Sequence, residues 1–210
     1  MADPVVQAIV LVDDLDAAGR RLESMGLTVS DGGRHPGRGT ANRIVAFAGQ
    51  YLELLAVVDE AEAAASPQGR PVMAAWARHG PGLARWSLEP RDIEATAHRV
   101  GHPVESRHRL LPDGTTIRWR CVGVDAAWDE PWRCAFLVWD DPRHHPGRPG
   151  TVHPNGATGF ARLEVVVPDR APLLAWLGGG VPEELAISVG TDPGPRALFL
   201  ASQEGEIPIM

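Results

Sequence analysis

The chain has 210 residues, 44% of them hydrophobic and 22% charged, which suffices for one substantial core or two small modules packed together. Its formal charge of −7 argues against nucleic acid and anionic membranes as partners, because both need a basic surface. No apolar run approaches the ~20 residues of a membrane span, and the first residues lack the basic region of a signal peptide. Two cysteines without a CxxC motif fit free thiols in a reducing compartment, so we expect a cytoplasmic protein.

The first predicted unit combines one strand, one helix and three more strands. Residues 5–12 are rich in β-branched side chains and predict a strand. Asp14 is a suitable N-cap for the helix that follows, whose apolar residues recur at helical spacing. Residues 27–33 predict a strand and turn, and residues 42–59 predict two strands joined by a tight turn. We therefore expect a βαβββ module over residues 1–60.

The same order of elements returns after a linker. Residues 61–79 are the linker, in which we expect a short helix. A strand is predicted at 82–90, and Asp92 opens a second short helix. Three strands follow, the first two joined by a turn at residues 112–114. These elements predict a second βαβββ module over residues 80–142.

A loop and a shorter unit complete the chain. Residues 143–157 are rich in turn residues, and residues 158–210 predict a partial βαββ unit, with one strand, one helix and two strands. One βαβββ unit leaves a sheet face bare, whereas two side by side make a curved sheet with helices outside and a hollow that suits a small molecule. We expect an α+β fold of paired βαβββ modules forming a β-sheet cup, with the third unit packed beside it. The alternative is an unrelated α+β domain whose strands only look alike.

Three stretches of the chain resemble the vicinal oxygen chelate superfamily, and within it the glyoxalase-like and bleomycin-resistance-like domains. They are VVQAIVLVDDLDAAGRRLESMGLTVSDGGRHPGRGTANRIV, QYLELLAVVDE, and PWRCAFLVWDDPRHHPG running into HPNGATGFARLEVVVPD. The resemblance implies paired βαβββ modules around a cup. It also implies one of two activities: metal-dependent chemistry on vicinal oxygen groups, such as isomerisation, ring cleavage or epoxide opening, or the binding of drugs without catalysis.

The metal positions that the resemblance implies carry few ligands. The first-strand and last-strand positions of the first module correspond to Gln7 and Glu53. In the second module they fall near Ala84 or Arg85 and among residues 134–136. Gln7 and Glu53 alone would hold a divalent cation weakly, and an Arg85 that faces the cup would repel one and pair with Glu53. We therefore predict no tightly bound metal as cofactor and leave a weak divalent site open.

Glu53 and His35 are the candidate catalytic residues. Strand alternation places Glu53 on one face with Tyr51 and places Leu52 and Leu54 on the other, where we expect the outer helices. A buried carboxylate needs partners or loses its charge, and we expect those of Glu53 to be Gln7 and one of His35, Asn42 and Arg85. His35 lies in a Gly-rich loop, and imidazole transfers protons near neutral pH. The alternatives are a solvent-exposed edge Glu53 and a turn in which His35 and Asn42 satisfy backbone groups.

The candidate substrate-binding residues are polar or aromatic side chains expected around the cup. They are Gln7, Thr40, Asn42, Arg85, Trp119, Trp139, His145 and His153. Arginines that alternate with tryptophans in the second module (Arg85, Arg118, Arg120 and Arg133) could hold an anionic ligand between aromatic walls, although tryptophan more often packs a core. For the histidines of the 143–157 loop we favour loop structure over a metal site.

Two classes of function follow from these residues. The first is an enzyme, a metal-independent lyase, isomerase or hydrolase that acts on a small oxygenated compound through Glu53 and His35. The second is a protein that sequesters a drug or an aromatic metabolite without catalysis. In both cases the expected partner is a small molecule, and a homodimer stays open. Turnover needs a titratable pair within hydrogen-bond reach, whereas sequestration needs only an aromatic-lined cup.

Overall fold

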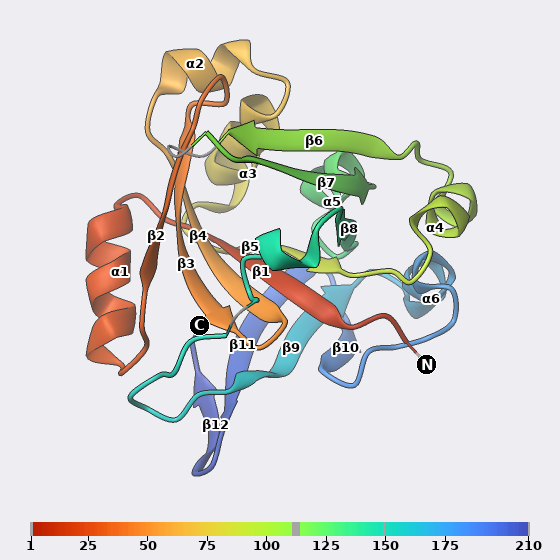
Figure 1. The fold of residues 1–210 in the computed structure, drawn as a ribbon. Coiled ribbons are helices and arrows are strands. Elements are labelled where there is room, and N and C mark those ends of the chain that lie inside the picture. Colours follow the sequence, from red (N-terminus) through yellow and green to blue (C-terminus); the bar gives the residue numbers. More distant parts are fainter. Residues whose placement is uncertain (1, 111–113, 149, 210) are drawn as a thin grey trace.

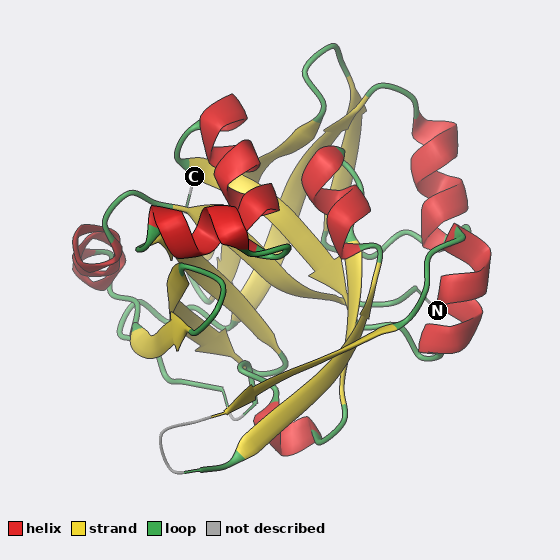
Figure 2. Cartoon of the chain, turned by 90° about the horizontal axis from the view of Figure 1, so that it is seen from above, coloured by secondary structure: helices red, strands yellow, loops and turns green. Residues whose placement is uncertain are grey.

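The structure is a computed structural model that describes residues 2–110, 114–148 and 150–209. Within these residues the strands form one sheet of eight and one sheet of four. Figure 2 shows the strands at the centre of the molecule and the helices around them. No described helix is long and apolar enough to cross a membrane.

The elements follow the chain in three groups (Figure 1). The first group is β1 (Val5–Leu11), α1 (Leu15–Ser24), β2 (Ser30–His35), β3 (Thr40–Phe47) and β4 (Gln50–Val57). The second is α2 (Glu60–Ala65), α3 (Gly69–His79), β5 (Gly82–Leu88), α4 (Ile93–Val100), β6 (Glu105–Leu110), β7 (Thr116–Val122), α5 (Val124–Asp129) and β8 (Ala135–Trp139). The third is a 3-10 turn (Pro142–His144), β9 (Gly159–Val167), α6 (Arg170–Leu177), β10 (Leu185–Val189), β11 (Gly194–Ser202) and β12 (Gly205–Pro208).

The eight-stranded sheet joins the two βαβββ modules edge to edge. Its order is β2-β3-β4-β1-β5-β8-β7-β6, so each module contributes four neighbouring strands. The first strand of each module pairs in parallel with the last, β1 with β4 and β5 with β8, and the modules meet at the antiparallel pair β1–β5. This confirms the predicted α+β fold of paired modules in a curved sheet.

The predicted helix starts form as expected. The carboxylate of Asp14 accepts hydrogen bonds from the backbone N–H groups of Asp16 and Ala17, and Asp92 caps α4 in the same way. Gly101 ends α4 in the left-handed region, at a φ of 72°. Two residues of the expected turn at 112–114, Pro112 and Asp113, lie outside the described residues.

The C-terminal unit has its own pairing pattern. Its strand order is β10-β9-β11-β12, with β10 parallel to β9, and the short strand β12 adds to the two strands expected after the helix. In the first module, by contrast, the strand that follows the helix lies at the far edge from β1. The C-terminal unit therefore repeats the order of elements but is not a topological copy of the modules.

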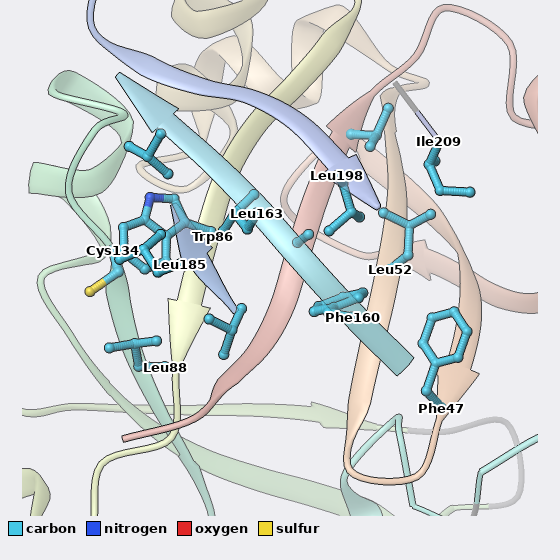
Figure 3. Close-up of a cluster of buried hydrophobic side chains, with 14 of the residues drawn as sticks. Phe47, Leu52, Trp86, Leu88, Cys134, Phe160, Leu163, Leu185, Leu198 and Ile209 are labelled. Carbon is cyan, nitrogen blue, oxygen red and sulfur yellow. The ribbon is translucent and has the colours of Figure 1, made fainter. Parts of the chain in front are cut away.

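The outer face of the large sheet is covered by the expected outer helices, α1 and α4, and also by the C-terminal sheet, which was not expected there. Leu52 and Leu54 share a buried cluster with Leu163 and Leu198 of the small sheet. Figure 3 shows Leu163 and Leu198 facing Leu52 and Trp86 across the two layers. The apolar half of the strand alternation was assigned correctly, and Leu22 of α1 and the C-terminal sheet bury it together.

Two helices lie on the inner side of the large sheet. Val72 of α3 and Val124 and Trp128 of α5 pack against Ile9 and Leu55, which are the cup-facing residues of β1 and β4. These helices therefore form part of the cup wall instead of an outer layer. The short helix α5 was not expected, because its six residues are too few for a periodic pattern.

Candidate functional site

A cavity of about 330 Å³ occupies the concave side of the eight-stranded sheet. Strands of both modules line it together with α3 and α5. Its floor is made by the three central strands, β4, β1 and β5, which present Glu53, Gln7 and Arg85. The register between β1 and β5 shifts on both sides of the Gln7–Ile9 segment. Such irregularities re-aim side chains and are common beside functional sites.

Glu53 is buried at the floor and both of its carboxylate oxygens are occupied. Gln7 Nε2 donates to Oε2 at 2.6 Å, and Asn42 Nδ2 donates to Oε1 at 2.7 Å. The side chain is 8% exposed, so the alternative of a solvent-exposed edge residue is wrong. Gly32 makes room for the amide of Asn42, because a Cβ at this position would clash with Asn42 Oδ1. The contacts expected for Glu53 are present, while its chemical role stays a prediction.

Gln7 connects Glu53 to a buried guanidinium. Its Oε1 accepts a hydrogen bond from Ser87 Oγ at 2.7 Å and a longer one from Arg85 Nη2 at 3.4 Å. No direct ion pair joins Arg85 and Glu53 in the described part of the chain, which corrects the expected pairing. The cation and the carboxylate are therefore held apart by one amide, and each uses a different end of it.

Arg85 is a cation with little compensation inside the protein. Its guanidinium lies 4.8 Å from the ring centroid of Trp128, and its Nε has no hydrogen-bond partner. Burial lowers the pKa of Arg85, and the nearby charge of Glu53 opposes that effect. An unpartnered N–H on a buried cation leaves part of the cost of burying that charge uncompensated within the protein.

The floor residues do not fit the divalent metal that the fold family implies. Both oxygens of Glu53 face amide N–H donors, and the only oxygen of the Gln7 side chain faces a hydroxyl and a guanidinium. In the second module, Cys134 and Phe136 point into the apolar core. Among the described residues no group of three His, Cys, Asp or Glu side chains is arranged to hold a metal ion. This set of side chains suits a metal ion poorly, because the guanidinium of Arg85 already lies at the floor and would repel it.

His35 and Thr40 lie together in the cavity wall. His35 Nδ1 is 2.9 Å from Thr40 Oγ1, so this imidazole contacts a side chain and not the backbone of a turn. Burial lowers the pKa of His35 to about 4, with the charge of Glu53 opposing the shift. The ring is therefore neutral near pH 7 and serves as a hydrogen-bonding group more readily than as a charged acid.

Three tryptophans and a tyrosine form the aromatic part of the wall. Trp119 and Trp139, both predicted, have ring centroids 5.1 Å apart and line the cavity. Trp128 and Tyr51 complete the wall. Burial raises the pKa of Tyr51 well above its usual value, so its hydroxyl stays protonated. Trp86, in contrast, lies on the other face of β5 and packs the core.

The two loop histidines predicted to contact a ligand do not line the cavity. His153 is structural, since its Nδ1 accepts from the N–H of Thr28 at 3.0 Å and its Nε2 lies 3.1 Å from the carbonyl of Ala46. His145 accepts from the N–H of Gly147 and packs edge-on against Tyr51 and Trp139, behind the wall. Both assignments are corrected, because His153 contacts the backbone of Thr28 and Ala46 in the first module and His145 contacts the backbone of its own loop.

Of the four arginines that the sequence suggested, only Arg85 lines the cavity. Arg120 faces away from the cup toward Glu94 and Asp140, Arg118 is exposed, and Arg133 pairs with Glu130. The arginines that do line the cavity are Arg38, Arg107 and Arg109, in addition to Arg85. The alternation in the 105–110 segment, ESRHRL, was the available signal, because residues 107 and 109 share one face of a strand.

Comparison with known proteins agrees with this fold. A hypothetical protein from Staphylococcus aureus is similar over 98% of this chain and 84% of its own, with a TM-score of 0.62 at 15% identity. Methylmalonyl-CoA epimerase from Mycobacterium tuberculosis is similar over 66% of this chain and 87% of its own, with a TM-score of 0.44 at 16% identity. The Streptomyces coelicolor methylmalonyl-CoA epimerase in complex with 2-nitronate-propionyl-CoA is similar over 66% of this chain and 97% of its own, with a TM-score of 0.45 at 18% identity.

A search of curated proteins finds no match. The sequence model of one family, described as a glyoxalase-like domain, matches residues 8–180, which include nearly all of both modules, strand β9 and the whole of α6. This match covers well over half of the chain and agrees with the resemblance noted in the sequence and with the paired modules of the structure. The chain therefore belongs to the glyoxalase-like domain family.

Proposed function

We propose that this protein is a metal-independent enzyme that moves a proton at a carbon next to a carbonyl group, with Glu53 as the base. The observation that carries the proposal is a buried carboxylate fixed by two amides, one amide away from a buried guanidinium, at the floor of the cup. A positioned carboxylate and a preorganised cation are the two groups that enolate formation requires.

The proposed step uses groups that the floor already holds. Glu53 removes the proton, so a C–H bond breaks and an O–H bond forms on the carboxyl group. The electron pair moves to the carbonyl oxygen, where the positive charge of the Arg85 guanidinium, which lines the cavity, stabilises the negative charge. Each oxygen of Glu53 accepts one hydrogen bond, and a carboxylate oxygen has two lone pairs, so one remains for the proton.

His35 has a supporting part in this proposal. Its Nδ1 faces Thr40, which leaves Nε2 for a ligand. With its pKa lowered to about 4, the ring is neutral near pH 7 and orients a polar group of the substrate by hydrogen bonding. The reaction class is then isomerisation, or elimination from the enolate, and in either case the charge is stabilised by Arg85 and not by a metal.

A second candidate function is sequestration without turnover. Three tryptophans in one cavity wall favour it, because aromatic side chains alone can retain a flat apolar molecule. This function needs neither Glu53 nor Arg85. Loss of the Glu53 carboxylate should therefore abolish the catalytic function but leave sequestration intact.

Exchange of carbon-bound hydrogen in D2O separates the two functions. The probes are 3-benzoylpropionate and its methyl ester, which both carry a CH2 group next to a ketone, and proton NMR follows loss of the CH2 signal. We expect the protein to accelerate exchange and Glu53→Gln to abolish it, with Glu23→Gln, a change on the exposed face of α1, as the control. Binding of the probes with no acceleration over buffer would assign the cup to sequestration.

Glu53→Gln is a conservative variant in this structure for a specific reason. Its new NH2 group needs an acceptor, and Asn42 can supply one by turning its amide over, because Asn42 Oδ1 has no partner to lose. Gln7 cannot turn over in the same way, since Ser87 and Arg85 hold its oxygen. The variant is therefore expected to fold and to lose only the charge.

A further inference from the structure

The cavity is positively charged within an acidic protein. Four guanidinium groups line it, those of Arg38, Arg85, Arg107 and Arg109, against two carboxylates, Glu53 and Asp125. The chain as a whole carries a formal charge of −7. With His35 neutral, the lining has more cations than anions, which is the opposite of the protein's average.

Arg107 and Arg109 project from one face of β6. Arg107 Nη2 donates to Glu105 at 2.7 Å, and its Nε has no partner. Arg109 donates to the backbone carbonyl of Gly32 in β2. Because β2 and β6 are the two edge strands of the sheet, this bond bridges its edges, and Figure 1 shows the end of β6 next to β2.

Arg38 lies at the same place, in the turn between β2 and β3. Its guanidinium is 5.7 Å from the ring centroid of Trp119. Across the described residues, neither Arg38 nor Arg109 forms an ion pair with a carboxylate. Burial, and after it the charges of Arg107 and Arg109, lower the pKa of Arg38, while the charge of Glu53 opposes the shift. Like charges gathered in a partly buried place destabilise the free protein unless an anion joins them.

We propose that Arg38, Arg107 and Arg109 bind a carboxylate of the substrate, so that the substrate is an oxo acid. The inference rests on the proposed function, because it names the substrate class of the same cup. The carboxylate lies against the three arginines between the sheet edges, and the carbonyl end reaches the floor beside Glu53 and Arg85.

The aromatic side chains beside the three arginines favour a carboxylate on an apolar body over a phosphate. One N–H of Arg109 is used by Gly32 and one of Arg107 by Glu105, which leaves the three guanidinium groups further N–H donors for an anion. Two coplanar carboxylate oxygens match a guanidinium fork. The apolar body of the acid packs against Trp119 and Trp139.

Isothermal titration with 3-benzoylpropionate and its methyl ester tests the inference, because the two probes differ only in the charge of the carboxyl group. We expect the acid to bind at least about tenfold more tightly than the ester. Arg38→Gln and Arg109→Gln should each remove most of this preference and leave the affinity of the ester unchanged. Arg118→Gln is the matched control, since it lies on the outward face of β7 and is exposed.

The inference is overturned if acid and ester bind equally, if neither binds, or if inorganic phosphate displaces the acid at equal concentration. Arg38 has no hydrogen bond to lose among the described contacts, so its variant remains informative even if Arg109→Gln fails to fold. The proposed function fails separately. Arginine-dependent binding of the acid without hydrogen exchange would leave the ligand class standing and remove the catalysis. Equal hydrogen exchange of the acid and the ester would support the catalysis and remove the inference that the arginines bind a carboxylate.

Discussion

Gln7 is the residue whose loss should disturb the floor most, and Gln7→Leu is the sharpest test of the floor. Its amide donates to Glu53 and accepts from Ser87 and Arg85, and all of these side chains are buried. Leucine has a similar volume and no polar atoms. The substitution therefore removes three hydrogen bonds without opening a large space.

The magnitude follows from the groups left without partners. A buried hydrogen bond to a charged group contributes about 1.5–3 kcal/mol, and a buried hydroxyl without an acceptor costs about 1–3 kcal/mol. The bond from Arg85 is long at 3.4 Å and adds little. We expect Gln7→Leu to lower the free energy of unfolding by about 3–4 kcal/mol. In a Glu53→Leu background the carboxylate is absent, so adding Gln7→Leu there should lower the free energy of unfolding by about 2 kcal/mol less than in the wild type.

Urea unfolding of the wild type, the two single variants and the double variant measures both quantities. Gln68→Leu is the control, because this glutamine also borders the cavity but is exposed, and a change within about 0.5 kcal/mol is expected there. A loss below about 1 kcal/mol for Gln7→Leu, or a coupling energy near zero with Glu53, would refute the argument that this amide holds the floor together.

Three further outcomes are expected. Burial lowers the pKa of His145 to about 4, so below the unfolded value near 6.5 the unfolded chain binds a proton that the folded chain does not. The free energy of unfolding should therefore fall as the pH drops from 6.5 to 4, by up to about 1.4 kcal/mol per pH unit. Urea titrations at several pH values should show that His145→Gln removes this component. Trp128→Leu should lower the free energy of unfolding by about 3 kcal/mol, and by more than Trp76→Leu does, because only Trp128 stacks on Arg85; equal losses would contradict this. Elemental analysis should find well under one equivalent of zinc, nickel, iron or manganese per chain, and a stoichiometric ion held by Glu53 would overturn the metal-independent proposal.

Regular local patterns made the module plan predictable. Asp14 and Asp92 followed by apolar residues at helical spacing marked the two module helices, and both carboxylates cap as expected. Alternation in YLELL placed Glu53 on the face opposite Leu52 and Leu54. Such signals are local, since each depends on residues a few positions apart.

The remaining features depend on contacts between distant segments, which local patterns do not contain. Nothing near Leu52 indicates that a sheet from residues beyond 158 covers it. Arg109 meets Gly32 only because two modules curl until the sheet edges approach. The ring of His153 is occupied by a backbone N–H 125 residues away in the chain, so its availability could not be judged from the loop sequence.

The packing of the C-terminal sheet behind the floor has a consequence for how the cup responds to charge. The strands β4, β1 and β5 have neighbours on both sides, and the small sheet covers their backs. Their peptide dipoles and the amide of Gln7, whose oxygen is held by Ser87 and Arg85, therefore cannot turn freely, as water molecules do when a charge appears among them. In the proposed reaction, negative charge would pass from Glu53 to a bound molecule whose surroundings are already oriented, so little free energy would go into rearranging them. The polar groups at the floor of the cup are therefore oriented when the chain folds, before any ligand binds.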